Sequence, residues 1–186
     1  LIKLRHIAGD AALGKKVETH RDSFVYSGAP WDLTVALDLR RQQVKQLVEP
    51  GQINLKHSHG GIVTLEYAIQ YLQVMHGHRH PSLRTPNTLR ALAALIDVGL
   101  IPRATGENLR KSYLFIRMLI DGLRMVRGNT KDLVIPPPDS DEFIFLARRV
   151  GYQTEDWQAG ARHLQTDIEE HMKQNRQFFE KMFGKV

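Results

Sequence analysis

A lysine and a pair of glycines precede an expected helix, in an arrangement that could bind an anion. Lys56 comes shortly before Gly60-Gly61, and apolar residues then recur at steps of three and four, at Ile62, Leu65, Ile69 and Leu72. Free backbone N–H groups and the positive end of a helix dipole both favour an anion there. Lys56, Gly60 and Gly61 are therefore candidates for contacting phosphate oxygens. The alternative is that the glycines only let the chain turn tightly into the helix.

Acidic and basic side chains elsewhere suggest structural ion pairs. Glu66 lies one turn into the same expected helix, and Arg84 or Lys56 could pair with it. We expect Arg84 and Arg117 to serve as structural ion-pair residues. Spacing alone indicates no Ser-His-Asp set and no pair of catalytic carboxylates.

Histidines form two groups, His57 with His59, and His76 with His78 and His80. Alternate histidines in an extended loop can converge on a metal ion. A helix of about 15 residues between the groups would separate them by roughly 20 Å, so one shared site would need an unusual fold-back. We therefore predict histidines in surface loops and no metal site.

Hydrophobic periodicity predicts helices along almost all of the chain after residue 31. The expected helices span about 32–49, 61–77, 85–98 and 105–127, followed by a short helix capped by Asp139 or Ser140 and a last helix from near Thr154. Trp157 and the Phe178-Phe179 pair are expected in the core, and a short extended piece is expected around Ile53 and Leu55. The prediction is an all-α, multi-helix bundle.

The segment that opens the second helix resembles the glutamine-synthetase adenylyltransferase family. In that family a Lys, a Gly-Gly pair, an Ile, an acidic residue and a Glu followed by an aromatic open the helical domain that follows a nucleotidyltransferase domain. The matching residues here are Lys56, Gly60, Gly61, Ile62, Glu66 and Tyr67, and a weaker likeness reaches about Tyr152. Where family members usually carry an Arg and an acidic residue, this chain has Val63 and Thr64.

The resemblance implies an activity for a longer protein rather than for this chain alone. That activity is transfer of AMP from ATP to a tyrosine of glutamine synthetase, or its phosphorolytic removal, with Mg²⁺. The family's Gly-Ser motif followed by Asp-x-Asp is missing, because no Gly-Ser dipeptide occurs and Asp139-Ser140-Asp141 follows three prolines that favour a helix start. We expect the chain alone to be inactive and to carry no cofactor.

The resemblance also predicts how the chain is organised. Residues 1–31 are expected to be the tail of, or linker from, a nucleotidyltransferase domain, with Phe24-Val25-Tyr26 as either its last strand or a loop. Residues 32–186 would then form one wall of the cleft and position the protein substrate, with Lys56, Gly60, Gly61 and Glu66 facing the nucleotide. The expected partners are that domain and glutamine synthetase. The alternative is a non-catalytic docking or regulatory module.

The composition of the chain narrows the classes of function that it could have. The 186 residues carry a net charge of +6, but the basic residues are scattered, so a nucleic-acid surface is not expected. The absence of cysteine excludes disulfides and thiolate chemistry and fits a cytoplasmic protein. No apolar run approaches the roughly 20 residues of a membrane span, and the first residue, Leu1, suggests a piece of a longer protein.

Overall fold

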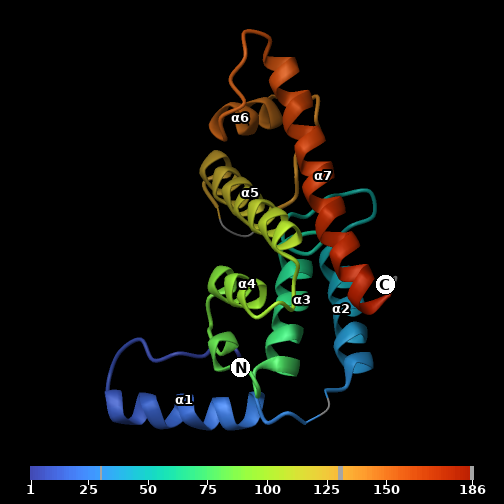
Figure 1. Ribbon diagram of the computed structural model, residues 1–186. Coiled ribbons are helices and arrows are strands. Elements are labelled where there is room, and N and C mark those ends of the chain that lie inside the picture. The colour runs from blue at the N-terminus through green and yellow to red at the C-terminus, as the bar shows by residue number, and fades with distance from the viewer. Residues whose placement is uncertain (30, 130–131, 185–186) are drawn as a thin grey trace. The chain divides into compact units, whose positions relative to one another are not determined.

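Helices account for nearly all the regular structure in the part of the chain that is described. The computed structural model describes residues 1–29, 31–129 and 132–184, and within them it contains seven α-helices, one 3₁₀ turn and no strand longer than an isolated bridge (Figure 1). These elements are α1 (Ala11–Val25), α2 (Leu33–Leu47), α3 (Ile62–His76), η1 (Pro81–Leu83), α4 (Thr88–Asp97), α5 (Arg103–Arg127), α6 (Asp141–Arg149) and α7 (Trp157–Phe183). The prediction of an all-α, multi-helix fold is confirmed. Across these residues, no helix is both long and apolar enough to cross a bilayer.

The chain divides into two compact units. Residues 1–33 and 66–110 form unit 1, and residues 34–65 and 111–186 form unit 2. The predicted boundary near residue 31 stays a prediction. The first 33 residues cluster with the segment from α3 to the start of α5.

In unit 1, buried polar side chains fix the turn between α3 and α4. Gln73 is buried on α3, and its Nε2 donates hydrogen bonds to the carbonyl oxygens of Leu83 at 2.6 Å and Thr85 at 2.8 Å. Arg84 donates from Nε to the Gly77 carbonyl at 2.8 Å, and its guanidinium lies 5.7 Å from the centre of the Tyr26 ring. These bonds satisfy backbone oxygens that a helix end leaves without partners.

Two sequence-based expectations for unit 1 were wrong. Phe24 and Val25 do not form a strand or a loop, because they are the last residues of α1, whose first turn is capped by the Asp10 carboxylate. The helix expected from Thr85-Pro86 begins later, at α4. Its N-cap is Asn87, whose side-chain oxygen accepts a hydrogen bond from the Arg90 N–H at 3.0 Å. An amide oxygen at this position satisfies a first-turn donor as well as a hydroxyl does.

In unit 2, α7 provides the longest buried face. The buried residues of this helix follow the predicted stripe: Ala161, Leu164, Ile168, Met172, Asn175 and Phe179. α6 packs against α7 and buries Phe143, Leu146 and Ala147, and its N-cap is Ser140, one of the two predicted caps. Trp157 was expected in the core, but it is 56% exposed at the first position of α7, with the Arg148 guanidinium 4.9 Å from its ring centre.

The extended piece expected around Ile53 and Leu55 is present in unit 2. The Leu55 N–H donates to the Leu133 carbonyl at 2.9 Å, and the Ile135 N–H donates to the Ile53 carbonyl at 2.8 Å. These bonds flank an antiparallel bridge between Asn54 and Val134. The bridge fixes the point where the loop before α3 begins.

Candidate functional site

The loop from Asn54 to Gly61 is held together by its own polar groups. The Asn54 side-chain oxygen accepts hydrogen bonds from the N–H groups of Lys56 and His57, both at 3.0 Å. The Asn54 N–H donates to the Ser58 hydroxyl at 2.8 Å, and the Ser58 N–H donates to the Asn54 carbonyl at 3.0 Å. Asparagine is well suited to this role, because its side chain can replace a backbone partner in a turn.

The backbone N–H groups at the start of α3 are already bonded within the protein. Gly61 donates to the Ser58 carbonyl at 2.9 Å, Ile62 to the Leu55 carbonyl at 2.9 Å, and Val63 to the Lys56 carbonyl at 3.2 Å. The Gly60 N–H donates to the Thr64 hydroxyl at 3.1 Å. An anion would have to displace these bonds to reach the backbone. In this conformation the group on the loop best placed for a phosphate is therefore the side chain of Lys56.

A buried arginine from α2 clamps the loop. The Arg40 side chain belongs to a residue only 1% exposed, and its Nη2 donates to the carbonyl oxygens of His57 at 2.9 Å and Ser58 at 3.2 Å. The same nitrogen donates to the Thr64 hydroxyl at 3.0 Å. Burying a guanidinium is costly unless it is well hydrogen-bonded, so these contacts are needed to keep it there. Thr64 therefore has a structural role here.

Gly60 lies in close contact with α7. Its φ of +86° favours glycine, and a Cβ there would lie 2.1 Å from the carbonyl oxygen of Met172. The Gly60 carbonyl accepts a hydrogen bond from Nδ2 of Asn175 at 3.0 Å. Gly61 is also tightly packed, since a Cβ would lie 2.8 Å from the Leu55 carbonyl oxygen. Both glycines therefore allow close backbone approach.

The clamp by Arg40 was not foreseen, although the sequence holds a signal for it. Arg40 falls three residues after Leu37 and four before Val44, inside the apolar stripe expected for α2. A polar residue in a helix stripe that faces the protein is a candidate for a buried, satisfied side chain. Asn175 lies in the corresponding stripe of α7 and binds the same loop.

The side chains of Lys56 and Glu66 were also candidates for the site. Lys56 is exposed, and its ammonium group makes no hydrogen bond or ion pair with the residues described. Glu66 belongs to unit 1, where its Oε1 lies 3.3 Å from Nζ of Lys3. Lys3 also donates to the Thr88 hydroxyl at 2.7 Å. Glu66 therefore forms an ion pair, but its partner is Lys3, 63 residues away in the sequence, and not the expected Arg84 or Lys56.

Arg84 and Arg117 were expected to form ion pairs, and neither does so with a carboxylate in the described part of the chain. Arg84 binds the backbone carbonyls of Gly77 and His78 at the end of α3. Arg117 is exposed on α5. Arg84 is thus structural through helix capping, since carbonyl groups at a helix C-terminus attract a cation.

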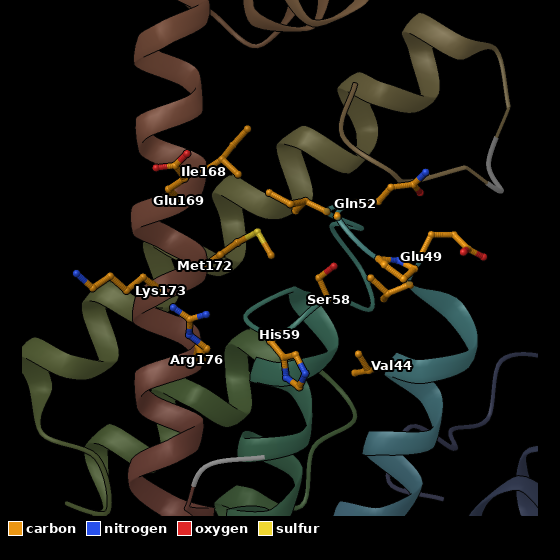
Figure 2. A pocket seen from close by; sticks show the side chains of 14 residues that line it. Val44, Glu49, Gln52, Ser58, His59, Ile168, Glu169, Met172, Lys173 and Arg176 are labelled. Carbon is orange, nitrogen blue, oxygen red and sulfur yellow. The ribbon is translucent and has the colours of Figure 1, made fainter. Parts of the chain in front are cut away.

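A pocket of about 550 Å³ opens beside the loop in unit 2 (Figure 2). Its walls are the end of α2, the turn that follows, the loop residues Ser58 and His59, and one face of α7. Val44, Ile168 and Met172 make part of this wall apolar, and Arg176 brings a positive charge to it. Lys56 is not among the residues that line the pocket as described.

Three of the predicted histidines, His57, His59 and His76, lie in environments that favour the neutral ring. Burial is the main cause that lowers the pKa of His57, and the cations of Lys56 and Arg40 add to it. Burial likewise lowers the pKa of His59, assisted by Arg40 and Arg176, while Glu180 opposes the shift. Burial and the neighbouring histidines lower the pKa of His76. No cluster of three or more potential metal ligands occurs among the described residues.

Comparison with known proteins relates this fold to one group of regulatory enzymes. A family model described as GlnD PII-uridylyltransferase matches residues 35–183. The bifunctional glutamine synthetase adenylyltransferase/adenylyl-removing enzyme of Mycobacterium bovis is 36% identical over 152 residues, which cover 80% of this chain and 15% of that protein. The enzyme of the same name from Corynebacterium efficiens is 31% identical over 179 residues, which cover 95% of this chain and 17% of the relative.

The residues matched by the family model include the loop together with Arg40 and Asn175, which hold it. The chain spans only 15% to 17% of the length of these relatives. Both the family model and the relatives cover most of the chain. By both comparisons, the chain belongs to the glutamine synthetase adenylyltransferase and PII-uridylyltransferase family.

Proposed function

We propose that this chain is a helical, substrate-positioning part of a longer nucleotidyltransferase that moves AMP between ATP and a tyrosine of glutamine synthetase. The relatives are named as enzymes that add and remove this group. The observation that carries the proposal is the loop before α3. In this loop Gly60 lies against α7, Gly61 packs against the loop's own carbonyl groups, and the Lys56 side chain is exposed to solvent.

The role assigned to Lys56 is electrostatic. An ammonium group on a loop fixed by Arg40, Asn54 and Asn175 needs little further ordering to meet a phosphate oxygen or a carboxylate. Gly60 and Gly61 contribute by setting the loop's position, and Glu66 by fixing the next turn of α3 through Lys3. Preorganised charges of this kind stabilise negative charge as it develops during transfer.

Mg²⁺ and the ATP phosphates would be held outside this chain. Magnesium needs carboxylate oxygens that converge, and the described residues offer no such cluster. No bond-making or proton-transfer step is therefore assigned to a side chain here, and Lys56 acts through its charge alone. The chain's own contribution is to position the protein substrate and to supply one wall of the nucleotide cleft.

A second function is favoured by one observation. Val63 and Thr64 replace the Arg and acidic residue usual in the family, and the Thr64 hydroxyl is taken up by Arg40 and Gly60. A chain that has lost two charged groups at the cleft could serve as a docking or regulatory module without taking part in catalysis. An assay of AMP transfer distinguishes the two functions, because only the first requires this reaction.

The test uses the longer protein that contains this chain, incubated with glutamine synthetase, Mg²⁺ and labelled ATP. We expect label on glutamine synthetase, and Lys56→Met should lower kcat/KM by about tenfold or more, the value of one charge-assisted contact. Lys111→Met, at another exposed lysine in unit 2, is the matched control. Binding of glutamine synthetase without transfer of AMP would support the docking module. Equal values of kcat/KM for the two variants would show that Lys56 does not contact the nucleotide.

A further inference from the structure

We propose that the pocket between α2 and α7 binds a small monocarboxylate with an apolar body. Its volume of about 550 Å³ falls in the range typical of small-molecule sites. The pocket lies wholly within unit 2 and does not include the Lys56 side chain. It is therefore a second site, separate from the proposed nucleotide contact.

The wall of the pocket is suited to an apolar body. Val44 comes from the end of α2, Val48 and Ile53 from the segment that follows it, and Ile168 and Met172 from α7. Figure 2 shows Met172 extending from α7 towards the segment that carries Gln52 and Ser58. An aliphatic or aromatic group in this space would lose contact with water, which stabilises binding by about 25 cal/mol for each Å² buried.

One end of the pocket is suited to a single negative charge. Arg176 on α7 lines it, and its guanidinium makes no hydrogen bond or ion pair with any other residue described. His59 from the loop and the Ser58 hydroxyl add groups that can form hydrogen bonds. A guanidinium can bind a carboxylate through two parallel N–H···O bonds, which is the geometry expected at this end.

The charges around the pocket argue against a nucleotide. Glu49 and Glu169 also belong to the lining, and they would repel a triphosphate. Figure 2 shows the Lys173 side chain directed away from the segment that carries Gln52 and Ser58, so Arg176 is the cation best placed for a ligand. The lining thus carries two cations and two carboxylates, and this balance favours a ligand with one negative charge over a ligand with four.

Methyl NMR of the chain labelled at its methionines tests the proposal directly. Met172 is a reporter within the pocket, and Met125, which is exposed on α5, is an internal control. The probes are 4-phenylbutyrate, the uncharged 4-phenylbutan-1-ol, and ATP. We expect 4-phenylbutyrate to shift the Met172 methyl signal saturably, with the alcohol binding at least about tenfold more weakly because it lacks the pair with Arg176.

Two variants test whether Arg176 is the group that pairs with the carboxylate of the ligand. Arg176→Gln should remove the preference for the acid and leave binding of the alcohol unchanged, whereas Arg117→Gln, at an exposed position of α5, should leave both unchanged. Equal affinity for acid and alcohol in the unaltered chain would overturn the carboxylate assignment. No shift at Met172 with either phenyl compound would overturn the site, and a stronger response to ATP would make it a nucleotide pocket.

Discussion

Replacing Gly60 with alanine measures how strongly the loop before α3 depends on its contact with α7. The change has two costs. Alanine at a φ of +86° is strained by about 1–2 kcal/mol. Its Cβ would also lie 2.1 Å from the Met172 carbonyl oxygen, so the loop or α7 must move, at a cost of about 1–3 kcal/mol. The expected loss of unfolding free energy is about 2–5 kcal/mol.

Gly51 provides a matched control in the same unit. Its φ of +78° is close to that of Gly60, but no atom lies within 4 Å of the position its Cβ would take. Gly51→Ala should therefore lower the free energy of unfolding only by the backbone strain of about 1–2 kcal/mol. The difference between the two variants isolates the close approach of the loop to α7.

Urea unfolding followed by far-UV circular dichroism gives both values under the same conditions. The NMR signal of the Met172 methyl group reports on unit 2 separately. If Gly60→Ala and Gly51→Ala lose the same free energy, the close packing of Gly60 against α7 does not contribute to stability. The reasoning that makes this glycine a packing residue would then be wrong.

Three further outcomes are expected. Arg40→Met should lose at least about 2 kcal/mol in urea unfolding, because the His57 carbonyl loses its donor and the Ser58 carbonyl and Thr64 hydroxyl each lose one partner, while Arg41→Met on the exposed side of α2 should lose under about 1 kcal/mol. Lys3→Met should also lose under about 1 kcal/mol, since its ion pair is partly exposed. Burial lowers the pKa of His171, so the unfolded chain takes up a proton first as the pH falls below about 6.5. Unfolding free energy should therefore fall from pH 7 to pH 5, and less so in His171→Phe; an identical pH dependence of the two proteins would contradict this.

Regular spacing made the long helices predictable. The predicted stripe on α7 repeats over many turns, so a wrong prediction at one position changes the predicted face little. Its buried residues agree with the prediction from Ala161 to Phe179. Trp157 fails because it is the first residue of the helix, where the chain is still entering from the turn and the ring lies over Arg148 instead of in the core. A periodic pattern predicts a face, but it does not show where burial begins.

Other features of the fold and the site could not be predicted from local sequence patterns. α1 was missed because it buries no residue and so shows no apolar stripe. The partner of Glu66 is Lys3, and side chains so far apart in sequence meet only through the fold. The site was partly predictable: the glycines mark the loop correctly, but the bonds that occupy its N–H groups come from Leu55, Lys56 and Ser58, which sequence alone does not place.

The bond from Asn175 to Gly60 has a consequence for the order in which the chain folds. The two residues are 115 positions apart, so closing this contact requires the helices between them to be formed or collapsed first. During synthesis, the residues around Lys56 leave the ribosome long before their support on α7 exists. We therefore expect this loop to be among the last parts of unit 2 to become ordered. A chain shortened before Asn175 should keep α3 and lose protection of the loop amides from hydrogen exchange.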